Sequence, residues 1–188
     1  MEQLIYSYRV GGAVLLSTPG FAAILLVEAV TESLSLLILL LLLGGRHGGV
    51  KKALRSPVFW VTAGISAGVL AFTIASVAAV NADYVVTGNC SLIAETSFGG
   101  IRIDLHSANV SLSTTSPIRV RVDGLGLPGV LIGWARLTDG RRALAIVYRS
   151  PGVYLVVEGE GSIFVASHPG VRKAYRVVTE VCRVHQER

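Results

Sequence analysis

Four polar residues lie in the first long apolar segment, at a spacing that gathers them on one side of a helix. Glu28, Thr31, Glu32 and Ser35 follow one another at i, i+3, i+4 and i+7, so a helix presents them on one face. Carboxylates inside an apolar segment are typical of ion or proton sites. Alternatively, both are protonated and hydrogen-bond to Ser or Thr of a neighbouring helix. We favour this second interpretation, because the sequence offers neither a basic partner nor a third apolar helix.

The two cysteines, Cys90 and Cys182, are the other residues with distinctive chemistry. One lies among the first predicted strands and the other on the apolar face of the last predicted helix. If this part of the chain lies outside the cytoplasm, a disulfide between them is reasonable. Two separate buried thiols are the alternative, and the sequence leaves both open.

The remaining motifs predict no catalysis. The four histidines lack metal-ligand spacing, and we interpret them as surface or capping residues: His47, His106, His168 and His185. The string Gly124-x-Gly126-x-x-Gly129 resembles a dinucleotide fingerprint, but a strand pattern follows it where the fingerprint requires a helix. We therefore expect no enzyme, no cofactor and no metal.

Two apolar segments dominate the first part of the chain. Residues 57–80 contain no charged side chain, and residues 20–43 contain only the two glutamates. A hydrocarbon core about 30 Å thick needs about 20 apolar residues in a helix. We expect residues 1–80 to form a transmembrane hairpin, followed from residue 81 by a second domain.

The second apolar segment also carries small residues at helical spacing. Such residues let helix backbones approach closely in a membrane. We expect them to pack against the first helix, with another subunit as the alternative: Gly64, Ala67, Gly68, Ala71 and Ala75.

The segment between the apolar runs, residues 44–56, is basic. It contains Arg46, Lys51, Lys52 and Arg55, whereas Arg9 is the one cation before the hairpin and none follows it until Arg102. Cytoplasmic loops carry the excess of Lys and Arg. The charge bias predicts a multi-pass cell-membrane protein with this loop in the cytoplasm and residues 81–188 outside it.

Residues 81–188 alternate apolar and polar side chains with the period of half-buried strands. Asp139-Gly140 separates two such runs and is a strong hairpin signal. An amphipathic helix follows at about residues 169–187. These patterns predict an α+β membrane protein: a transmembrane hairpin plus a small antiparallel β barrel or sandwich of seven to nine strands, closed by a C-terminal helix.

This order of parts resembles the bacterial pleckstrin-homology-like (PH-like) family, whose members often follow two transmembrane helices. The resemblance covers roughly residues 84–182 and rests on glycine and turn patterns: Tyr84-Val-Val-Thr-Gly88, Ser91-Leu-Ile, Gly100-Ile-Arg-Ile-Asp-Leu105, Gly124-Leu-Gly-Leu-Pro-Gly129, Asp139-Gly140 and Ile163-Phe-Val-Ala-Ser-His-Pro169. It implies a PH-like fold and a binding module.

Composition narrows the function classes further. The net charge of +5 forms no dense basic stripe with interleaved aromatics, so we expect no nucleic-acid partner. The single methionine is consistent with a thermophilic source. We expect a non-enzymatic protein that contacts membrane lipid and displays its domain to bind a protein partner or to form a homo-oligomer. The alternative is an accessory subunit of an ion- or proton-coupled complex that uses Glu28 and Glu32.

Overall fold

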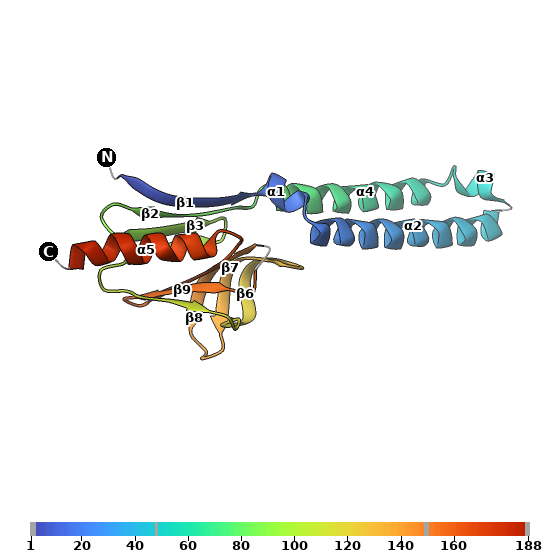
Figure 1. Cartoon of the computed structure of the whole chain (residues 1–188). Coiled ribbons are helices and arrows are strands. Elements are labelled where there is room, and N and C mark those ends of the chain that lie inside the picture. Colours follow the sequence, from blue (N-terminus) through green and yellow to red (C-terminus); the bar gives the residue numbers. More distant parts are fainter. Residues whose placement is uncertain (1–2, 48, 149–150, 187–188) are drawn as a thin grey trace. The chain divides into compact units, whose positions relative to one another are not determined.

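The computed structural model describes residues 3–47, 49–148 and 151–186, and they divide into two compact units (Figure 1). One unit runs from Ala13 to Ala78, and the other combines the residues up to Gly12 with those from Ala79 onward. The predicted hairpin comprised all of residues 1–80. In the structure, the residues up to Gly12 belong to the other unit, because they contain a strand that pairs with a strand after the hairpin.

The first unit is a pair of long helices, α2 (Pro19–His47) and α4 (Pro57–Ala78), with the short α3 (Val50–Ala53) between them. Thr18 caps α2, since its Oγ1 accepts the Phe21 N–H at 3.2 Å. A proline opens each long helix, where its missing N–H leaves no bond unmade. Within the described residues, both helices are long and apolar enough to cross a membrane. Their bounds lie within a few residues of the predicted 20–43 and 57–80.

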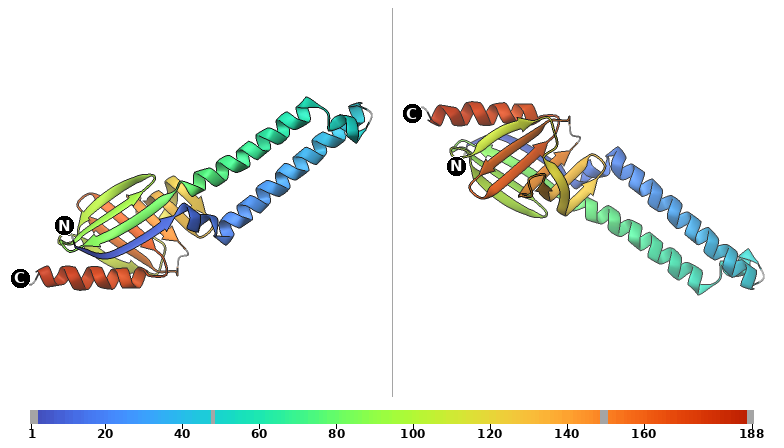
Figure 2. Two further views of the ribbon diagram at one scale, coloured as in Figure 1. Left: turned by 90° about the horizontal axis from the view of Figure 1, so that it is seen from above. Right: turned by 90° about the horizontal axis from the view of Figure 1, so that it is seen from below.

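The second unit begins with a strand that the sequence analysis did not predict. β1 (Leu4–Gly11) pairs antiparallel with β2 (Asn81–Thr87), with Tyr8 opposite Tyr84 and Gly11 opposite Asn81. The two strands run side by side in the left view of Figure 2. The short α1 (Gly12–Leu16) follows β1. The helical hairpin is therefore an insertion between two paired strands of one domain.

The strands of this unit form two sheets. The first has the order β1-β2-β3-β4, with β3 at Ser91–Thr96 and β4 at Gly99–Asp104. The second has the order β5-β9-β10-β8-β7-β6. Its strands are β5 (Asn109–Ser113), β6 (Ile118–Leu127), β7 (Val130–Leu137), β8 (Arg142–Tyr148), β9 (Tyr154–Gly159) and β10 (Ser162–Ser167).

The prediction of a purely antiparallel barrel or sandwich needs two corrections. β10 pairs in parallel with β8, because the β9–β10 hairpin folds back so that β10 inserts between β9 and β8. Neither sheet closes on itself by hydrogen bonds. The described strands therefore form two open sheets in an α+β fold.

The six-stranded sheet is strongly curled. Its edge strands β5 and β6 are consecutive in the chain, and the five steps from Ser113 to Ile118 span at most about 18 Å, whereas flat edges would lie about 24 Å apart. A buried cluster that includes Ala135, Ala145 and Val165 draws its members only from β6–β10. The sheet therefore folds around its own inner face, where small side chains fit.

The other face of this sheet contacts the four-stranded sheet. Trp134 on β7 donates its Nε1 hydrogen to the backbone oxygen of Phe98, at 3.0 Å, in the β3–β4 turn. A Cβ on Gly159 would lie 2.4 Å from the Ile103 side chain, so β9 and β4 approach closely where glycine permits it. These contacts define the core between the sheets.

The last helix, α5 (Val171–Gln186), contacts β5, β9 and β1 and lies beside the strands (Figure 2). The predicted helix spanned about residues 169–187. Its apolar face buries Val171, Ala174, Val178 and Cys182. The side chains of Val181 and of His185, the latter interpreted from sequence as a surface or capping residue, lie outside the described residues.

A ring of hydrogen bonds connects β1, β2 and the start of α5. The Gly170 N–H donates to Nδ1 of His168 at 3.1 Å, so Nε2 carries the ring hydrogen and donates to the Tyr84 hydroxyl at 2.6 Å. Tyr84 hydrogen-bonds in turn to Tyr6, whose hydroxyl donates to the Gly170 oxygen at 3.5 Å. Tyr8 stacks on His168 with ring centroids 3.6 Å apart. Of the two predicted roles for His168, the surface position was wrong, because its ring is fully buried, whereas the bond from the Gly170 N–H makes it a cap at the start of α5.

Candidate functional site

Polar residues of the hairpin meet between α2 and α4. The Ser66 hydroxyl donates to a carboxylate oxygen of Glu32, and the Thr73 hydroxyl donates to Oε1 of Glu28 at 3.5 Å. The helices are antiparallel, so the later residue of α4 lies opposite the earlier residue of α2. Each glutamate therefore has a hydroxyl partner on the other helix.

The other two residues of the predicted stripe point elsewhere. Thr31 donates its hydroxyl hydrogen to the Val27 oxygen, and Ser35 donates to the Thr31 oxygen, each at 2.8 Å. Both side chains are exposed on α2. Bonds of this kind satisfy a hydroxyl within its own helix. The interhelical site therefore contains Glu28 and Glu32 but not Thr31 or Ser35.

A cavity of about 270 Å³ lies at this site. Glu28 and Glu32 line it from α2, and Ala63, Ser66 and Ala67 line it from α4. Among the described residues, Oε2 of Glu28 is buried and has no hydrogen-bond partner. Two carboxyl groups beside hydroxyl oxygens have the chemistry to hold a proton or a cation that prefers oxygen ligands.

The small residues of α4 divide between two faces. Ala67 lines the cavity against α2. Gly64, Gly68, Ala71 and Ala75 lie at i, i+4, i+7 and i+11, so they share a different face. A Cβ on either glycine would meet no atom within 4 Å, and both alanines are exposed. The hairpin itself leaves this face of α4 uncovered.

The two cysteines lie close together in the β domain. Both are buried thiols, and the thiol of Cys182 hydrogen-bonds with that of Cys90. Burial, followed by the Cys90 contact, raises the pKa of the Cys182 thiol to about 12. The Cys182 thiol is therefore protonated at neutral pH.

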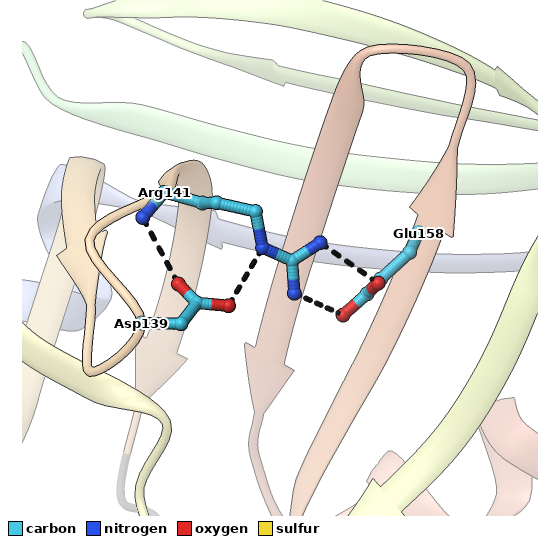
Figure 3. Close-up of polar contacts among 3 residues, drawn as sticks. All are labelled: Asp139, Arg141 and Glu158. Carbon is cyan, nitrogen blue, oxygen red and sulfur yellow. Dashed lines mark hydrogen bonds and ion pairs between the residues drawn. The ribbon is translucent and has the colours of Figure 1, made fainter.

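Two neighbouring arginines of the β domain, Arg141 and Arg142, contact other side chains of the domain. Arg141 bridges Asp139 and Glu158: it bonds Oδ2 of Asp139 at 2.6 Å and both Glu158 oxygens at 3.0 Å (Figure 3). Hydrogen bonds from Arg141, its backbone N–H first, lower the pKa of Asp139. Arg142 lies over the Trp134 ring, 4.2 Å from its centroid. These cations have partners within the domain.

The glycine string forms part of a β-hairpin. Gly124 and Gly126 lie within β6, and Gly129 lies in the turn that precedes β7. A strand follows, so the helix that a dinucleotide fingerprint requires is missing here. The described residues also contain no group of three or more His, Cys, Asp or Glu side chains placed to hold a metal ion.

No protein family, curated protein or solved structure matches this chain. The resemblance to the bacterial PH-like family therefore stays a prediction from sequence. Function has to be argued from the arrangement of the residues themselves.

Sequence reasoning missed the partners of the two glutamates. Ser66 and Thr73 lie seven residues apart on the second apolar helix, which is two helical turns. That spacing places both hydroxyls on one face of the second helix, a face that could meet Glu28 and Glu32. This was the sequence signal that could have identified the two partners. The partners of His168 had no such signal, because Tyr6 and Tyr84 are far from it in sequence.

Proposed function

We propose that this chain is a non-enzymatic membrane protein that assembles with another membrane helix, either of a second copy or of a protein partner. The carrying observation is the uncovered face of α4 formed by Gly64, Gly68, Ala71 and Ala75. In a bilayer, lipid tails are as apolar as leucine, so helices associate where small residues let their backbones approach. Within the hairpin, α2 uses a different face of α4.

The membrane anchor in this proposal consists of α2 and α4. Both helices have the length and hydropathy for a span. Pairing of β1 with β2 requires the strand before the hairpin and the strand after it to lie on one side of the membrane. Two crossings satisfy this requirement. The basic loop 44–56 supports a cytoplasmic tip and an extracytoplasmic β domain.

The β domain is the binding module of this proposal, as the PH-like resemblance implies. The outer strand β6 exposes Val120 and Val122, at 51% and 52% of their surface. An edge strand has unpaired backbone groups that a partner strand can meet. In this proposal the β domain selects the protein partner, and α4 packs closely against the partner's membrane helix.

Crosslinking of the full chain in bilayers tests the assembly. We expect the wild type to crosslink to itself or to recover a protein partner after gentle solubilisation. Gly64→Leu with Gly68→Leu adds bulk to the open face and should abolish the crosslink without unfolding the hairpin. Val69→Leu adds bulk elsewhere on exposed α4 and serves as the control. A wild-type chain that stays monomeric and is recovered alone contradicts the proposal.

A second candidate function is that of an accessory subunit in an ion- or proton-coupled membrane complex. The cavity beside Glu28 and Glu32, together with the unpartnered Oε2 of Glu28, favours it. Changing both residues to Gln keeps the side-chain shape and an oxygen for each hydroxyl contact but removes both ionisable groups. If this candidate holds, the double variant folds and assembles but loses coupled transport. Unchanged transport by the intact complex removes it.

A further inference from the structure

Cys90 occupies a backbone position that suits glycine better. The three-residue loop Gly88–Cys90 joins β2 to β3, and the Cys90 N–H donates to the Thr87 oxygen at 3.0 Å. The third residue of such a hairpin loop takes the left-handed conformation, usually as glycine. Cys90 has φ 56° and is the one non-glycine residue with positive φ among the described residues. A side chain held in this conformation needs a compensating contact.

That contact is the second cysteine of the chain. The Cys90 side chain is fully buried, and α5 brings Cys182, also buried, to its thiol. The Leu105 N–H donates to the Cys90 oxygen at 2.8 Å, and Leu105 lines a small cavity together with Val178 and Cys182. The β2–β3 loop, the end of β4 and α5 therefore meet at the two sulfur atoms.

We propose that Cys90 and Cys182 form a disulfide that attaches α5 to the β2–β3 loop. The oxidant is a protein disulfide carrier of an oxidising compartment. A thiolate of the pair attacks the carrier disulfide and forms a mixed disulfide, and the second cysteine then displaces the carrier sulfur. The chain loses two electrons and two protons, and the carrier leaves as a dithiol. The proposal rests on the extracytoplasmic location of the domain but not on assembly through α4.

Thiol–disulfide exchange takes place before α5 docks, because docking buries both sulfur atoms and raises the pKa of the Cys182 thiol. After docking, the same burial shields the bond from soluble reductants. The bridge closes a loop from residue 90 to residue 182, which constrains the unfolded chain. It also holds the helix that begins beside the His168 ring.

Thiol labelling of the full chain tests the bond directly, because these two cysteines are the only ones in the sequence. Membranes are quenched in acid, denatured, and treated with maleimide–polyethylene glycol before or after reduction. We expect no addition before reduction, two additions after it, and a monomer band in both cases. Two additions before reduction, or a dimer that reductant dissolves, overturns the proposal.

Two single variants calibrate the experiment. Cys182→Ala and Cys90→Gly each leave one thiol, which should be labelled once without reduction. Cys90→Gly also relieves the left-handed position, so it separates loss of the bridge from damage to the loop. Reduction in denaturant, followed by refolding with the reductant present, should lower the thermal midpoint of the wild type by several degrees and leave that of Cys182→Ala unchanged. A wild-type midpoint that is insensitive to reduction counts against the bridge.

Gly64→Leu with Gly68→Leu alters neither cysteine, so failure of assembly and failure of the bond are separate results.

Discussion

The Tyr84 hydroxyl lies 2.6 Å from Nε2 of His168, and both side chains are fully buried. This contact connects β2 with the segment that leads into α5. Tyr6 extends it to β1, the strand that precedes the hairpin. The two parts of the chain that flank the hairpin are thereby held in one core.

Removing the Tyr84 hydroxyl should destabilise the β domain. Tyr84→Phe keeps the ring packing but leaves the His168 Nε2 hydrogen and the Tyr6 hydroxyl without their buried partner. An unsatisfied buried polar group costs about 1–3 kcal/mol. Thermal unfolding of the solubilised chain should show the loss. Tyr154→Phe, on a half-buried tyrosine outside this ring, is the control. Equal stability of Tyr84→Phe and wild type would contradict the assigned network.

Acid should weaken the same core. Burial lowers the pKa of His168 to about 4, below its ordinary value of 6.5. The unfolded chain therefore binds a proton at this residue between about pH 6.5 and 4 that the folded chain does not bind. The stability that the neutral, buried His168 gives to the folded domain is fully present above pH 6.5. It is lost as the pH falls from 6.5 to about 4. Denaturant titrations at several pH values should show the decline.

The control for this pH effect is His168→Gln, which removes the titrating group and leaves every carboxylate in place. Its stability should be lower than that of the wild type at neutral pH. Its dependence on pH between 6.5 and 4 should be shallower. Parallel curves for the two proteins would assign the acid sensitivity to other groups.

Two serines of the hairpin should respond differently to the same change. Ser66 donates across the helix interface to Glu32, whereas Ser35 donates to its own helix. Ser66→Ala should lower hairpin stability by about 0.6–1.7 kcal/mol, the range for hydrogen bonds between membrane helices. Ser35→Ala should have little effect. Denaturation of the chain in mixed micelles measures both, and equal effects would argue against a bond between the helices.

The tight contact between β6 and β7 should not tolerate an added methyl group. A Cβ on Gly133, at φ 126°, would lie 2.4 Å from the Asp123 oxygen and 2.8 Å from Cα of Gly124. Gly133→Ala should therefore prevent folding of the curled sheet. Gly129→Ala, at φ 76° with open space around it, should cost about 1–2 kcal/mol. Yield and circular dichroism compare the two. A well-folded Gly133→Ala protein would show that the strands can separate.

Much of the architecture is visible in the local pattern of residues. The prolines at positions 19 and 57 and the apolar runs after them indicate both long helices within a few residues of their bounds. The alternating residues of 130–137 indicate β7 correctly, and Asp139-Gly140 indicates the turn after it. Helices and strands of this kind are recognisable because their periodicity lies within a single segment.

Other features could not be predicted from the sequence, because their local patterns are weak or because they depend on segments far apart in the chain. β1 has eight residues, but its apolar residues run on into the apolar segment before α2, so the sequence does not separate the strand from the hairpin. Its partner β2 follows about seventy residues later. β5 is five residues long and rich in serine, and it is a strand because β9 pairs with it. β10 pairs in parallel with β8 because β9 lies on the far side of β10 in the sheet. No pattern of neighbouring residues indicates this order of strands.

By itself, the sequence determined that two helices are apolar enough for a membrane and that a strand-rich domain follows, since hydropathy and periodicity are properties of neighbouring residues. Tertiary structure alone decided which residues meet. It inserted the hairpin between paired strands, placed Ser66 beside Glu32, buried His168 against Tyr84 and brought Cys90 to Cys182. These contacts join segments far apart in the chain, and their geometry depends on how complete sheets and helices pack together.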